Sequence, residues 1–147
     1  MTELKFTAKD IAIAAHHQQT YGDAPYMDHV EAVVRQVVQS FGCQPYITDV
    51  AYLHDVLEDG DPDKFNPMDL SKYVSPTVLD AVIFLSKNYV NSYEEYIRRL
   101  VDDRDNGNQL AWKVKVADTL SNLAASVISD EPKRVIKYSK QLELLYK

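Results

Sequence analysis

Cysteine, glycine and proline are scarce in this sequence, and their scarcity excludes several ways of building a small protein. The single cysteine, Cys43, has no second thiol to pair with, so a scaffold held by internal disulfides is excluded. We interpret Cys43 as a small apolar residue, buried or half-buried, and not as a nucleophile. Four glycines and six prolines in 147 residues argue against long linkers and low-complexity tracts. We therefore expect one domain that spans residues 1–147.

Long apolar runs and an excess of positive charge are also missing. No apolar run is long enough to span a bilayer and no signal-peptide pattern begins the chain, so we expect a cytoplasmic protein without a membrane partner. The 22 Asp and Glu residues outnumber the 16 Lys and Arg residues, which gives a formal net charge of −6. This charge argues against a nucleic-acid partner bound by bulk electrostatics. A small anionic substrate would need a metal ion or a local basic cluster. The sequence leaves the oligomeric state open.

Helical periodicity is the main pattern that the sequence does contain. Hydrophobic residues make up 46% and charged residues 26% of the chain, as in an ordinary globular protein with a real core. No segment alternates with a period of two over a useful length. We predict an all-α protein, a compact helical domain of about seven to eight helices.

Helix-start signals support this prediction. Thr7 is followed three residues later by Asp10, Ser92 is followed by Glu95, and Ser75 precedes a proline, all of which are N-cap patterns. The expected helices run from residue 8 to the turn at 22–25, over 27–40, from 45 to the acidic turn at 58–62, over 77–85, 93–101 and 110–128, and from 132 onward, with a polar loop at 102–108.

His54 and Asp55 form an ionisable pair within an otherwise apolar segment, residues 50–57. Burying such a pair in a helix of Val, Leu and Tyr is costly unless a metal ion or a dedicated partner compensates it. Neighbouring residues on a regular helix point about 100° apart. An ion that contacts both must therefore lie between them and take further ligands from other helices.

Three candidate ligands lie elsewhere in the chain, namely His29, Asp118 and the amide of Asn122. Two histidines and two carboxylates suit a divalent ion such as Mn²⁺, Fe²⁺ or Zn²⁺. An open coordination position would activate a water near neutral pH. A metal-dependent hydrolase is the first interpretation to test.

Each of these residues also has a plainer interpretation. A histidine at a helix start, such as His29, is more often a capping or packing residue. Asp118 alone is usually a solvated charge. Glu58 and Asp59 could simply end a helix, although acidic residues there oppose the helix dipole. The joint occurrence of these residues favours the metal site.

Together these segments resemble the HD-domain superfamily, and within it the RelA/SpoT-type pyrophosphohydrolase domain. Residues 24–29 (Ala-Pro-Tyr-Met-Asp-His) resemble the Pro-Tyr-x-x-His segment of the family. Residues 53–59 (Leu-His-Asp-Val-Leu-Glu-Asp) match the segment with the name-giving His-Asp pair and the Glu-Asp of this branch. Residues 115–123 resemble the Lys-x-Ala-Asp-x-x-x-Asn block. Residues 85–87 and 92–97 are similar to the small stand-alone members, so the resemblance implies a single HD phosphohydrolase domain.

The resemblance implies a Mn²⁺ cofactor, or another divalent metal, and an alarmone substrate. The metal ligands it implies are His29, His54, Asp55 and Asp118. The family hydrolyses the 3′-pyrophosphate of (p)ppGpp and releases pyrophosphate. Glu58 and Asp59 would orient or deprotonate the attacking water and handle the leaving-group proton. Asn122 and Lys115 would lie beside the substrate.

The sequence departs from the family where basic residues are expected. Alarmone hydrolases carry Arg, often with a second base, before the Gly-x-Pro-Tyr turn, whereas residues 18–24 contain no base, and the position after Asp118 is Thr119. The candidates that could compensate are Lys87, Lys113, Arg98 and Arg99. For Lys87 and the two arginines, a solvated surface is the plainer interpretation. Tyr21, Tyr26 and Tyr52 could stack a base or ribose, or could belong to the core.

Three functions follow from these residues. The first is hydrolysis of the 3′-pyrophosphate of an alarmone nucleotide, with Tyr21 and Lys87 among the substrate contacts. The second is an HD-type nucleotidase, which would release orthophosphate from another nucleotide. The third is a nucleotide-binding protein that keeps the HD scaffold without catalysis. Retention of Glu58 favours catalysis over the third.

Overall fold

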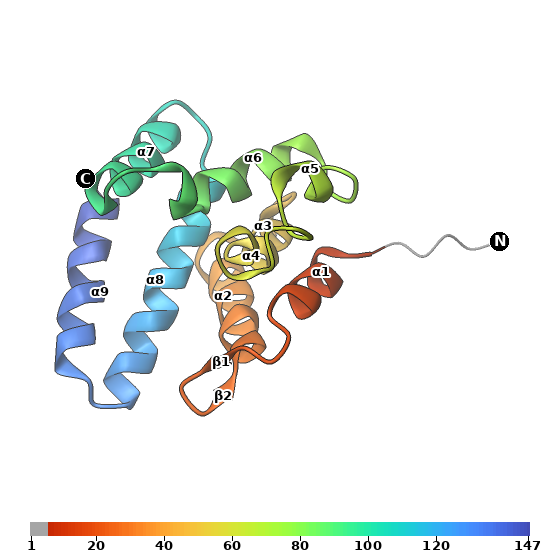
Figure 1. Ribbon diagram of the computed structural model, residues 1–147. Helices are drawn as coiled ribbons and strands as arrows, with labels where there is room; N and C mark the ends of the chain where they lie inside the picture. Colours follow the sequence, from red (N-terminus) through yellow and green to blue (C-terminus); the bar gives the residue numbers. More distant parts are fainter. Residues whose placement is uncertain (1–5) are drawn as a thin grey trace.

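The computed structural model describes residues 6–147, and nearly all of its secondary structure is helical (Figure 1). In chain order the helices are α1 (Ala8–Ala15), α2 (Tyr26–Phe41), α3 (Ile47–Leu53), α4 (Val56–Asp59), α5 (Pro67–Leu70), α6 (Pro76–Leu85), the 3-10 helix η1 (Lys87–Tyr89), α7 (Tyr93–Asp105), α8 (Leu110–Ile128) and α9 (Pro132–Leu145). Strands β1 (Thr20–Tyr21) and β2 (Ala24–Pro25) pair antiparallel as a short hairpin. The prediction of an all-α protein is confirmed.

Helix α8 is the central element of the fold. It lies between α9 and α2, and it also contacts α3, α6 and α7 (Figure 1). From residue 111 to residue 119 every side chain except that of Lys113 is buried, so α8 is enclosed on nearly all sides. Two charged side chains, Lys115 and Asp118, are consequently held inside the core, where they pair with each other and Asp118 also contacts His29 of α2.

The predicted N-caps explain where three helices begin. Thr7 and Asp10 form a capping box at α1, and the Ser75 hydroxyl accepts a hydrogen bond from a backbone N–H of the first turn of α6. At α7 the Ser92 hydroxyl accepts from the Glu95 N–H at 3.1 Å. The Glu95 carboxylate, however, accepts from the Asn91 backbone and not from that of Ser92, so the expected box closes one residue earlier.

Two segments are more helical than predicted. Helix α7 continues to Asp105 instead of ending near residue 101. Its last turn is stabilised because Arg104 donates from Nη1 to the carbonyl of Leu145 at 2.9 Å and stacks 5.1 Å from the Trp112 ring. The short helix α5 was not predicted, although Asn66 before Pro67 is an N-cap pattern, and the Asn66 side chain caps it.

Cys43 lies in the exposed turn between α2 and α3, so the prediction that it is buried or half-buried is wrong. Gly42 ends α2 with a positive φ of 81°, and the chain then leaves the core for the solvent before Ile47 re-enters it.

Within residues 6–147, no helix combines the length and the apolar character needed to cross a membrane.

Candidate metal centre and active site

A cavity of about 220 Å³ opens where α2, the α3–α4 junction, α8 and α9 meet. The ten residues to which the sequence assigned metal binding, catalysis or substrate contact all line it, whereas several alternatives lie elsewhere. The ten are Tyr21, His29, His54, Asp55, Glu58, Asp59, Lys87, Lys115, Asp118 and Asn122. The cavity therefore collects residues from segments as far apart as the β-hairpin and α8.

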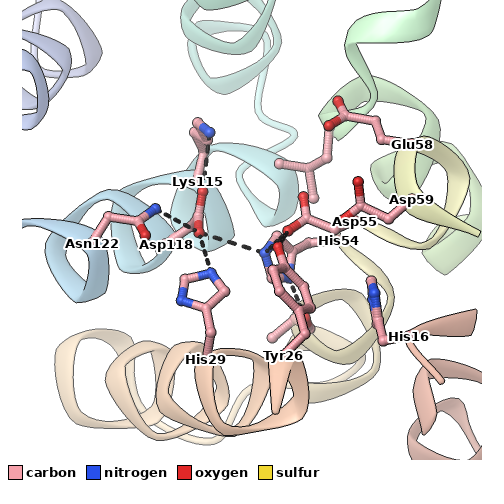
Figure 2. A network of polar contacts seen from close by, with 12 residues as sticks. His16, Tyr26, His29, His54, Asp55, Glu58, Asp59, Lys115, Asp118 and Asn122 are labelled. Atoms are coloured by element: carbon pink, nitrogen blue, oxygen red, sulfur yellow. Dashed lines mark hydrogen bonds and ion pairs between the residues drawn. The ribbon is translucent and has the colours of Figure 1, made fainter. Parts of the chain in front are cut away.

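His54 and Asp55 lie at a break between two helices and not on one continuous helix. Helix α3 ends at Leu53, Asp55 has φ −112° and ψ 3°, and α4 begins at Val56. The expected helix through residues 45–58 is thus interrupted at these two residues. Because the backbone leaves the helical path there, both side chains point toward Asp118, as Figure 2 shows. Side chains of neighbouring residues on a regular helix diverge by about 100°, whereas here Nε2 of His54 and Oδ2 of Asp55 lie 2.9 Å apart.

The His54 imidazole presents one free nitrogen to the centre. Its Nδ1 lies 2.7 Å from the carbonyl oxygen of Ala51, which can only accept, so Nδ1 carries the proton. Its Nε2 lies 2.9 Å from Oδ2 of Asp55 and 3.5 Å from Oδ1 of Asp118. This Nε2 is buried and has no hydrogen-bond partner among the residues that the structure describes. A histidine whose Nδ1 is fixed by a carbonyl and whose Nε2 points at carboxylates is typical of a metal ligand.

His29 and Asp118 complete the group from α2 and α8. Nε2 of His29 lies 3.0 Å from Oδ1 of Asp118 (Figure 2). One potential ligand atom from each of His29, His54 and Asp55 lies within 4.8 Å of the other two. Four nitrogen and oxygen donors therefore converge from three separate parts of the chain. This donor set fits a divalent cation of borderline or hard character.

The charges of these groups depend on one another. Burial opposes ionisation of Asp118, but Lys115, His29 and His54 outweigh it and hold the pKa of Asp118 well below its usual value. Burial also opposes ionisation of Asp55, yet His54 lowers the pKa of Asp55 to about 2. Conversely, burial disfavours a charged His54, while the two carboxylates raise the pKa of His54 well above its usual value. The centre thus keeps two carboxylates ionised and demands positive charge between them.

Lys115 and Tyr26 hold the two carboxylates in place. Nζ of Lys115 lies 3.0 Å from Oδ2 of Asp118, and the Tyr26 hydroxyl donates to Oδ2 of Asp55. The burial of Tyr26 and its contact with Asp55 raise the pKa of the phenol, so Tyr26 stays a donor. Each carboxylate is therefore oriented by a second residue, as the ligands of protein metal sites usually are.

Glu58 and Asp59, both on α4, form an acidic side of the cavity beyond Asp55 (Figure 2). Glu58 accepts a hydrogen bond from the backbone N–H of Lys87, and burial raises the pKa of its carboxyl group. Asp59 accepts from Nε2 of Gln19 at 3.1 Å. A carboxylate with a raised pKa beside a cluster of candidate metal ligands suits the role of a general base.

The opposite side of the cavity is built around Asn122 and Tyr21. The Tyr21 hydroxyl donates to Oδ1 of Asn122 at 2.7 Å, and Nδ2 of Asn122 lies 3.2 Å from Oδ1 of Asp118. The Tyr21 ring stacks parallel to His29, with centroids 4.9 Å apart. One face of this ring is thus already occupied by a protein side chain.

Sequence reasoning missed the contribution of α9. Lys137, Tyr138 and Gln141 line the cavity, and Arg134 donates from Nη2 to the Tyr21 hydroxyl at 2.6 Å. In the sequence, Val135, Tyr138 and Leu142 recur at helical spacing. This spacing gave no signal that the helix lies against α8 beside the site.

Several alternatives raised by the sequence lie away from the cavity. Lys113 donates to Gln44 at 2.9 Å, and the Arg99 guanidinium stacks 4.9 Å from the Phe84 ring. Arg98 does not line the cavity, and the Tyr52 hydroxyl donates to Glu31 on α2. Of the basic residues considered as compensation, Lys87 reaches the cavity.

No protein-family model and no curated protein matched the sequence. Among solved structures, the chain is similar to one described as a metazoan orthologue of SpoT that hydrolyses ppGpp and plays a role in starvation responses. The two superpose with a TM-score of 0.73 over 94% of this chain and 83% of that chain, at 23% sequence identity. This chain therefore shares its all-α fold with that structure over most of both chains.

Proposed function

We propose that this protein is a divalent-metal-dependent phosphohydrolase that removes pyrophosphate from the 3′ position of a (p)ppGpp-like alarmone nucleotide. The observation that carries the proposal is the convergence of the buried Nε2 of His54 with two carboxylates and a second histidine. The likeness of the fold to a ppGpp-hydrolysing protein supports the choice of substrate class.

The metal, which we propose to be Mn²⁺, would be held by His29, His54, Asp55 and Asp118. The residues fit such a group because Nδ1 of His54 is fixed by a carbonyl while its Nε2 points at the two carboxylates. When bound, a divalent cation supplies Lewis acidity that neutralises developing charge on phosphoryl oxygens. The positive charge demanded by the two ionised carboxylates would then come from the ion instead of from a protonated His54.

Glu58 and Asp59 would manage the protons of the reaction. Glu58, whose pKa is raised by burial, would accept a proton from the attacking water. Asp59, held by Gln19 at the mouth of the cavity, would orient that water or supply the leaving-group proton. Two carboxylates in different surroundings can divide acid and base roles in this way.

Substrate phosphates would meet cations from two elements. Lys87 follows α6 and Lys137 lies on α9, and both are exposed and line the cavity. Lys115 also lines it, but its Nζ is bound to Asp118, so we assign it first to the carboxylate and only through it to the substrate. Asn122 and Tyr21, which are hydrogen-bonded to each other, would lie beside the nucleotide.

The test is product analysis by ion-exchange chromatography. The protein is incubated with Mn²⁺ and a panel of ppGpp, pppGpp, ppApp and common mono- and triphosphates. Asp55→Ala is the blank, and Asp49→Ala, an exposed aspartate on the neighbouring helix α3, is the matched control. We expect pyrophosphate from at least one alarmone with wild type and Asp49→Ala, and none with Asp55→Ala.

Two other results would contradict the proposal. Orthophosphate from an ordinary nucleotide, with no alarmone turnover, would assign the protein to the nucleotidase branch. Tight binding of a nucleotide without any turnover in the metal-loaded protein would favour a binding protein.

A further inference from the structure

The corner between α1 and the β-hairpin places a buried histidine next to the acidic side of the cavity. His16, the C-cap residue of α1, is 3% exposed, and its ring lies 4.6 Å from that of Tyr26. Nδ1 of His16 is 2.8 Å from Oε1 of Gln19, whose Nε2 is 3.1 Å from Oδ2 of Asp59. Figure 2 shows His16 beneath Asp59, on the side of Tyr26 away from Asp118.

We propose that His16 and Gln19 are positioning residues that hold the Asp59 carboxylate in its working orientation at the cavity. This inference rests on the proposed function, because it takes Asp59 to be a group that acts on the substrate or its water.

The chemistry of the three groups gives the chain of hydrogen bonds a single direction. An ionised Asp59 can only accept hydrogen bonds, so Gln19 must turn its NH₂ group toward it. The Gln19 carbonyl oxygen then faces His16, which must carry its proton on Nδ1 in order to donate. Nε2 of His16 is left bare, and it has no hydrogen-bond partner among residues 6–147. The tautomer of His16 is therefore set by Asp59, which lies on a different helix.

The backbone around Gln19 is as constrained as its side chain. The Gln19 N–H donates to the carbonyl of His16 at 3.0 Å, and the Gln19 carbonyl accepts from the Tyr26 N–H at 2.9 Å. Gln18, which lies between His16 and Gln19 in the sequence, has a positive φ of 66°, a conformation that costs a non-glycine residue free energy. A hydrogen-bonded four-residue turn with a positive φ at its third position holds the backbone of residues 16–19 in a defined conformation.

The Asp59 carboxylate needs a neighbouring side chain to hold it in one orientation. It is exposed and is the last residue of the four-residue helix α4. In the part of the chain that the structure describes, its carboxylate receives a side-chain hydrogen bond from Gln19 alone. A misplaced catalytic group lowers the rate about tenfold to hundredfold while leaving substrate binding largely intact.

The first experiment measures kcat and KM for pyrophosphate release from the preferred alarmone. We expect His16→Leu and Gln19→Leu each to lower kcat roughly tenfold to hundredfold, with KM and metal stoichiometry close to wild type. His16→Asn, whose amide N–H can replace the Nδ1 donor, should recover most of kcat. His17→Leu, the exposed neighbour, is the matched control and should behave as wild type. In an Asp59→Asn background, Gln19→Leu should have no further effect, because its role is exercised through Asp59.

A second measurement does not depend on turnover. Long-range ¹H–¹⁵N NMR of the imidazole in the protein loaded with Zn²⁺ reports which nitrogen of His16 is protonated. We expect the Nδ1–H form in wild type and a mixture of tautomers in Asp59→Asn and Gln19→Leu.

An Nε2–H form in wild type, or an unchanged spectrum in Asp59→Asn, would overturn the inference. So would kcat within twofold of wild type for both leucine variants of an active enzyme. If wild type hydrolyses no alarmone, the proposed function fails. The NMR result alone then decides whether the hydrogen-bond chain from His16 through Gln19 to Asp59 exists.

Discussion

Lys115 is a buried cation beside the candidate metal ligands, and its replacement by methionine should destabilise the metal-free protein far more than the metal-loaded one. The lysine is 8% exposed, with Nζ 3.0 Å from Oδ2 of Asp118 and 5.5 Å from the centre of the Tyr96 ring. Methionine keeps the length and apolar stem of the side chain but removes its charge. In Lys115→Met, Asp118 would stay buried beside Asp55 with less positive charge to balance the two carboxylates.

The magnitude follows from the cost of an unpaired buried charge. Removing one partner of a buried ion pair typically costs about 3–5 kcal/mol of unfolding free energy. For a domain of this size, that loss lowers Tm by roughly 6–20 °C. When a divalent cation is bound, it neutralises Asp118 directly, so we expect the cost to fall to about 2 kcal/mol.

The difference between the stability losses of the metal-free and the metal-loaded protein must also appear as a change in metal affinity. Folding and metal binding form a thermodynamic cycle, and a variant that loses less stability when loaded must bind the metal more tightly. A difference of about 2 kcal/mol corresponds to roughly 30-fold tighter binding of Mn²⁺ by Lys115→Met. The physical reason is that Lys115 repels a cation that approaches Asp118.

Urea unfolding with and without Mn²⁺ measures the two unfolding free energies of this cycle. Calorimetric titration of each protein with Mn²⁺ measures the metal-binding free energies. Lys113→Met is the matched control, since Lys113 lies on the same helix and its Nζ contacts Gln44 instead of a carboxylate. We expect that control to change stability by less than about 1 kcal/mol. A loss below about 1 kcal/mol for metal-free Lys115→Met would refute the assigned ion-pair role. Equal losses in both states, with unchanged metal affinity, would place the metal away from Asp118.

Three further changes test other parts of the structure. Glu58→Gln should keep fold and metal content but lower kcat at least about 100-fold. The ionised form of Glu58 is the base and its pKa is raised, so the loss of wild-type kcat at acid pH should occur above the usual pKa range of Glu. This acid limb of the pH profile should be absent in the variant. Gly60→Ala should destabilise the protein by about 1–3 kcal/mol in urea unfolding, since the added Cβ would lie 2.7 Å from the Val56 carbonyl oxygen; a neutral result would mean that α4 shifts freely. Lys137→Ala should raise KM for a (p)ppGpp-like substrate several-fold with little change in kcat, as uniform loss of binding does. Lys133→Ala, exposed in the first turn of the same helix, should change neither constant.

Local sequence signals predicted the long helices well because each carries its own start and stop. α8 occupies Leu110–Ile128, the same residues that its apolar spacing indicated. α7 was predicted too short because what stabilises its last turn is the contact of Arg104 with Trp112 and with the end of α9. The contact of Arg104 with Leu145 joins residues 41 positions apart, and no local pattern encodes it.

The candidate site was predicted as a set of residues but not as a geometry. Ten residues from five segments of the sequence meet around one cavity, while the break between α3 and α4 that brings His54 and Asp55 together was not foreseen. Periodicity could not reveal it, because Val50, Leu53 and Val56 continue the apolar spacing across the break and are all buried. The roles of the ten residues stay predictions, for which the kinetic and metal-binding tests are designed.

The missing basic residues show most clearly what a sequence pattern leaves out. The hairpin carries Tyr21 and no Arg or Lys, which by itself argues against a multiply phosphorylated substrate. In the fold, Arg134 donates to the Tyr21 hydroxyl, and its guanidinium lies 5.5 Å from the centre of that ring. A cation 113 residues away in the chain is thus placed beside the position where the hairpin lacks one, and Lys137 lies one turn further along the same helix. The acidic groups of α4 lie across the cavity, so the site is polarised, which supports a substrate whose phosphates extend from the candidate metal ligands toward α9.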